Sequence, residues 1–127
     1  MKSDSIKREF FSWIDTVLTE PIPKSTVAFH FNLYEGTDSI HVQLIGTDSF
    51  EHVGEYWPGG ETFSTGENIF EVPFQCAGPE WPQWLESVNQ LVSAYLVSGA
   101  QSSILRRSLG VGIGFVDGDM HVLWSSA

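Results

Sequence analysis

The strongest constraint on the fold is the stretch Trp81–Ser98, which has the apolar periodicity of a helix lying on a core. Its large apolar residues recur at three- and four-residue intervals, which places them on one helix face. They are Trp84, Leu85, Val88, Leu91, Val92, Tyr95 and Leu96. Pro82 suits the first turn, and Gly99 predicts the helix end. Because a helix cannot bury such a stripe alone, we expect a β-sheet beneath it.

A second amphipathic helix is predicted over residues 5–19. Its apolar positions have helical spacing and comprise Ile6, Phe10, Trp13, Ile14, Val17 and Leu18. Asp4 or Ser3 is the expected N-cap. Pro21 and Pro23 are expected to end the helix, because a residue that precedes proline avoids the helical region.

A β-hairpin is predicted from Thr26–Tyr34 and Ser39–Gly46, which both alternate apolar and polar residues around the turn Glu35–Asp38. The predicted register places Leu33 opposite Ile40, Phe31 opposite Val42 and Phe29 opposite Leu44. The other face then carries His30, Asn32, His41 and Gln43, and we expect that face to meet solvent or a partner.

The two histidines of this polar face raise the question of a metal site. Zinc needs three or four ligands, and no cysteine or carboxylate stands at ligand spacing from His30 and His41. We therefore expect no metal and no cofactor. A solvated sheet face accounts for these histidines equally well.

The segment Thr47–Phe63 does not have the pattern of a regular core strand or helix. Acidic and aromatic residues are interleaved in it before a Pro-Gly-Gly turn. Part of it can form a third strand. Aromatic side chains supply anchor area at interfaces, and carboxylates complement Arg and Lys. We expect the partner-binding residues here to be Asp48, Glu51, Glu55, Trp57 and Glu61. The alternative is that Tyr56 and Trp57 cover the core while the acids stay hydrated.

The remaining strands complete the predicted sheet. Residues 67–74 form one strand, with either Ile69 or the pair Phe70 and Val72 turned inward, and Pro73 favours an edge position. Residues 109–124 form a terminal hairpin closing at Asp117-Gly118. Its predicted pairs are Phe115 with Met120, Ile113 with Val122 and Val111 with Trp124. The predicted fold class is α+β in a single domain, 1–127: a mainly antiparallel sheet with two amphipathic helices packed on one face.

Charge is distributed unevenly along the chain. The net charge is −10, and no lysine or arginine occurs from Ser25 to Leu105. Ten carboxylates lie in that span: Glu35, Asp38, Asp48, Glu51, Glu55, Glu61, Glu67, Glu71, Glu80 and Glu86. Such a field repels nucleic acid and anionic membranes and attracts basic surfaces. Solubility alone is the competing explanation.

Several classes of protein are disfavoured by what the sequence lacks. No apolar run is long enough to span a membrane, and no secretory signal is evident at the N-terminus. The single Cys76 fits a reducing cytoplasm and has no catalytic partner at a known spacing. Neither a P-loop nor a G-x-S-x-G or H-E-x-x-H motif is present, and Gly110, Gly112 and Gly114 do not match dinucleotide-binding spacing. We therefore do not expect an enzyme.

The segment Asp48–Phe63 and the terminal stretch GFVDGDMHVLW together resemble small acidic α+β immunity proteins of bacterial polymorphic-toxin systems. The order of elements over most of the chain (helix, antiparallel strands, long helix, terminal hairpin) is similar as well. The resemblance implies a cytoplasmic protein that binds and neutralises a cognate toxin. It assigns no individual binding residue.

Three functions follow as hypotheses. The first is a non-catalytic acidic protein that neutralises a basic protein partner, a bacterial toxin. The second is a small-ligand-binding domain or enzyme that uses the polar sheet face around His30 and His41. The third is a structural or oligomeric module whose acidity serves only solubility.

Overall fold

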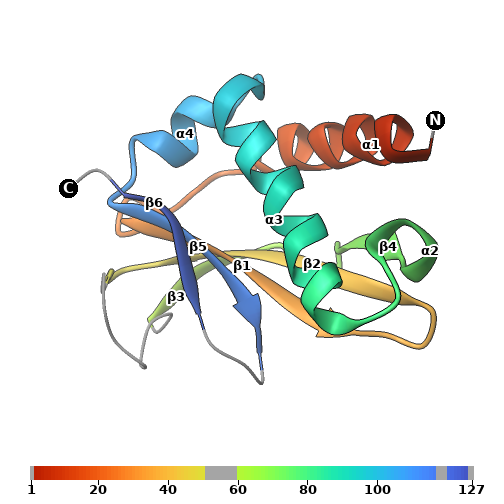
Figure 1. Cartoon of the computed structure of the whole chain (residues 1–127). Helices are drawn as coiled ribbons and strands as arrows, with labels where there is room; N and C mark the ends of the chain where they lie inside the picture. Colours follow the sequence, from red (N-terminus) through yellow and green to blue (C-terminus); the bar gives the residue numbers. More distant parts are fainter. Residues whose placement is uncertain (1, 51–59, 117–119, 126–127) are drawn as a thin grey trace.

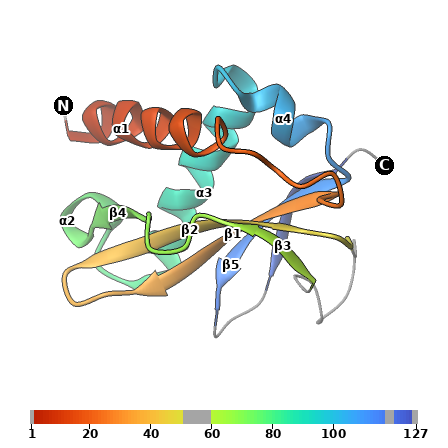
Figure 2. The same ribbon diagram turned by 180° about the vertical axis from the view of Figure 1, so that it is seen from behind.

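The computed structural model describes residues 2–50, 60–116 and 120–125 and shows the predicted α+β architecture. A sheet of mostly antiparallel strands lies under the helices, and Figures 1 and 2 show α1, α3 and α4 on the same side of it. The helices are α1 (Lys2–Val17), α2 (Phe74–Ala77), α3 (Trp81–Ser98) and α4 (Ser102–Arg106). The strands are β1 (Ala28–Glu35), β2 (Ser39–Thr47), β3 (Glu61–Ser64), β4 (Phe70–Pro73), β5 (Gly110–Phe115) and β6 (His121–Ser125).

The long helix α3 has the predicted bounds, with Pro82 in its first turn. Val88, Val92 and Tyr95 are fully buried, as the apolar stripe predicted. Gly99 follows the last residue of the helix, as predicted. It is not a left-handed cap, because its φ is −67°. A Cβ on Gly99 would lie 2.3 Å from the ring of Tyr95, so this ring leaves no room for a side chain.

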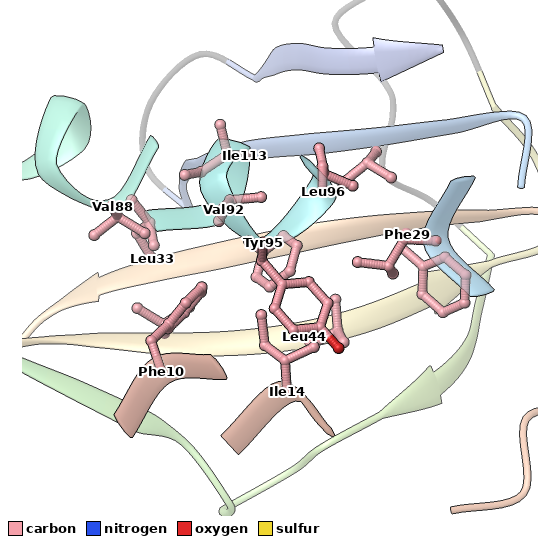
Figure 3. Close-up of a cluster of buried hydrophobic side chains, with 14 of the residues drawn as sticks. Phe10, Ile14, Phe29, Leu33, Leu44, Val88, Val92, Tyr95, Leu96 and Ile113 are labelled. Atoms are coloured by element: carbon pink, nitrogen blue, oxygen red, sulfur yellow. The ribbon is translucent and has the colours of Figure 1, made fainter. Parts of the chain in front are cut away.

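Helix α1 begins at Lys2, so the predicted N-cap at Asp4 or Ser3 is wrong: both residues lie inside the helix. It ends at Val17, two residues before the predicted end. Its buried face packs with α3 on the sheet, and Figure 3 shows Phe10 and Ile14 facing Tyr95 within one apolar cluster.

The strand order is β3-β2-β1-β5-β6, and β4 pairs with β2 along the edge that β3 also uses. Strands β1 and β5 pair in parallel, which the sequence analysis did not predict. Thr65 spans the interval between β3 and β4 on this edge. Its amide donates to the carbonyl of Leu44, and its hydroxyl accepts from the amide of Leu44. The ladder of β2 is thereby continued where neither short strand reaches.

The first hairpin has the predicted faces but a different register. Leu33 lies opposite Val42, Phe31 opposite Leu44 and Phe29 opposite Gly46, each two residues from the predicted partner. A shift of two residues keeps every side chain on its face, because side chains alternate along a strand. Val72 of β4 is buried opposite Ile40, and Pro73 occupies the predicted edge position.

The terminal hairpin agrees with the prediction at one end only. Val111 lies opposite Trp124 as predicted, but a bulge follows, and Ile113 pairs with His121 instead of Val122. A bulge adds one unpaired residue to a strand and therefore moves the register by one. The predicted turn at Asp117-Gly118 lies outside the described residues.

Candidate partner-binding site

Two of the predicted partner-binding residues, Asp48 and Glu61, lie at neighbouring positions where β2 ends and β3 begins. Glu61 pairs with Thr47, and the amide of Asp48 donates a 3.0 Å hydrogen bond to the carbonyl of Gly60. Both carboxylate residues are exposed. The other three predicted members, Glu51, Glu55 and Trp57, lie outside the described residues.

Before residue 51, the side chains of Asp48 and Phe50 each occupy the place that a Cβ would take at a glycine. Gly60 has a φ of +67°, and a Cβ there would lie 2.0 Å from Oδ1 of Asp48. Phe50 lies against Gly110 of β5, where a Cβ would be 2.2 Å from the Phe50 ring. The hydroxyl of Thr47 donates to the carbonyl of Ser49 at 2.7 Å. Sequence reasoning predicted a turn at Gly60 but not its contact with Asp48.

The described carboxylates of the acidic span are exposed but do not form one group. They are Glu35, Asp38, Asp48, Glu61, Glu67, Glu71, Glu80 and Glu86. Asp48 and Glu61 lie at the C-terminal end of β2. Glu35, Asp38 and Glu71 lie at its opposite end, since Ile40 pairs with both Glu35 and Val72. The nine residues of β2 separate these two ends by roughly 25 Å.

Three cations of the chain, Lys24, Arg106 and Arg107, are close in sequence to residues at the end of the sheet that carries Asp48 and Glu61. Lys24 stands two residues before Thr26, whose hydroxyl hydrogen-bonds that of Thr62 at 2.6 Å. Helix α4, with Arg106 and Arg107 at its end, leads into Leu109, whose amide donates to the carbonyl of Val27. Even so, among the residues whose side chains are described (5–50, 60–80, 82–116 and 120–125), the one contact between a basic side chain and a carboxylate within ion-pair distance is that of His41 Nε2 with Glu71 Oε1, at 3.3 Å. No carboxylate among these described side chains is paired with a lysine or an arginine.

The predicted polar face of the sheet exists as a chain of hydrogen bonds. Asn32 Nδ2 donates to Oε1 of Gln43, which also accepts from the hydroxyl of Tyr34. Oδ1 of Asn32 therefore serves as an acceptor, and Nδ1 of His30 donates to it at 2.7 Å. Gln43 Nε2 in turn donates to the carbonyl of Gly66.

The expectation that this whole face meets solvent is wrong at His30, which is only 3 % exposed. Burial lowers the pKa of His30 to about 4, because desolvation disfavours the imidazolium, and the bond to Asn32 offsets only part of this. His41 lies opposite Tyr34, four residues along β1 from His30, or roughly 13 Å away. The two histidines therefore do not share a site.

The described residues also bear on metal binding and membrane insertion. Among the described residues, no three His, Cys, Asp or Glu side chains gather closely enough to bind a metal ion. None of the described helices has the length and apolar character that crossing a membrane requires. Comparison of the chain with protein-family models, curated proteins and solved structures found no match.

Proposed function

We propose that this chain is a non-catalytic acidic protein that binds and neutralises a basic protein partner, a cognate bacterial toxin, as an immunity protein does. The observation that carries the proposal is that the described carboxylates between residues 35 and 86 are exposed, and that none of them is paired with a lysine or arginine among the described side chains. Uncompensated surface carboxylates attract basic surfaces and raise association rates.

The proposed mechanism is occlusion of a nucleic-acid-binding cleft. Carboxylates would take the place of nucleic-acid phosphates, steer the basic toxin and then cover its active site. Asp48 and Glu61, which lie at neighbouring positions where β2 ends and β3 begins, are two of the proposed binding residues. Glu51, Glu55 and Trp57, which lie between them in the sequence, are the further proposed members. Cytoplasmic localisation belongs to this proposal, because the toxin would be met there.

The alternative of a small-ligand site around His30 and His41 has less support. The first imidazole is buried, the second is paired with Glu71, and the two are separated along the sheet. A catalytic or ligand-binding pair must converge on one reacting atom or ligand. Among the described residues, the large hydrophobic side chains that are exposed come from different elements, Val97 from α3 and Tyr34 from β1, which gives the alternative of an oligomeric module less support.

The proposal is tested with the product of the adjacent open reading frame as bait. The purified chain should form a stable complex with that product in a pull-down, and co-expression should restore growth to cells that the neighbour alone inhibits. A neighbour that is harmless, or that stays toxic and unbound in the presence of this chain, contradicts the proposal.

A further inference from the structure

We draw no further inference here: the strongest candidate, the exposed patch that Tyr34 and Val116 form where the paired strands β1 and β5 end, is a small apolar surface, and nothing in the described part of the chain shows what covers it.

Discussion

The hydroxyl of Tyr95 on α3 donates a 2.5 Å hydrogen bond to Oδ1 of Asp15 on α1 and thereby joins the two helices that cover the sheet. The same oxygen accepts a 3.0 Å hydrogen bond from the amide of Gln101, just before α4. Burial raises the pKa of Tyr95, so the phenol stays protonated and remains a donor. One side chain thus connects three helices through its hydroxyl.

Replacing Tyr95 with Phe should therefore destabilise the protein by about 1–3 kcal/mol, because a hydrogen bond to a charged acceptor is lost and the amide of Gln101 loses its partner. The free energy of unfolding from urea titration measures this. Tyr34→Phe is the matched control, since that hydroxyl is exposed and bonds Gln43 at 3.2 Å. Equal stabilities of the two variants would show that the Tyr95 hydroxyl does not connect the helices energetically.

Gly99 should not tolerate alanine, although its backbone conformation would allow it. A methyl group would lie 2.3 Å from the Tyr95 ring, and this ring is fully buried and cannot move aside. Overpacking of this kind costs about 1–3 kcal/mol. Ser98→Ala, next to it on the exposed side, should change the free energy of unfolding by about 0.5 kcal/mol or less. A Gly99→Ala protein as stable as the native one would contradict this packing.

Stability should depend on pH through His30. Its pKa is about 4 in the folded chain and 6.5 when unfolded, so the unfolded chain binds the proton first as the pH falls. Stability should be full above pH 6.5 and should decrease towards pH 4, by up to about 3 kcal/mol at 1.36 kcal/mol per pKa unit.

Urea titrations at several pH values between 4 and 7 test this dependence on His30. His30→Leu should be less stable than the native chain at neutral pH but should show a smaller loss between pH 6.5 and 4. The control His121→Gln removes an exposed imidazole and should keep the native dependence. If His30→Leu and His121→Gln have the same slope, His30 is not the group responsible.

The sequence predicted most of what depends on local periodicity. The bounds of α3 follow from its apolar stripe and from Pro82, and the inward faces of β1 and β2 follow from alternation. The register of this hairpin did not follow, because the same alternation fits two registers that differ by two residues. The parallel pairing of β1 with β5 joins strands far apart in the sequence, and no local pattern indicates it.

The site was predictable only in part for a similar reason. Residue types made Asp48 and Glu61 candidates, and the predicted hairpin already placed Glu35 and Asp38 at the far end of its second strand. Only the fold shows that Glu71 stands at that far end as well. The run without lysine or arginine also overstated the separation of charge. Folding returns Lys24, Arg106 and Arg107 to the end of the sheet near Asp48, although none of them pairs with a carboxylate of the described chain.

The central claim is that the acids around Asp48–Glu61 bind a basic partner. It is tested most directly by two variants of equal net charge: Glu51→Lys/Glu55→Lys at the proposed site, and Glu35→Lys/Glu86→Lys away from it. Stopped-flow measurement with the neighbouring gene's product, over a range of salt concentrations, gives the association rate constant. The site variant should associate at least about tenfold more slowly, with a flatter salt dependence and a nearly unchanged Tm, and the control should change much less. Equal rate constants for the two variants would contradict the claim.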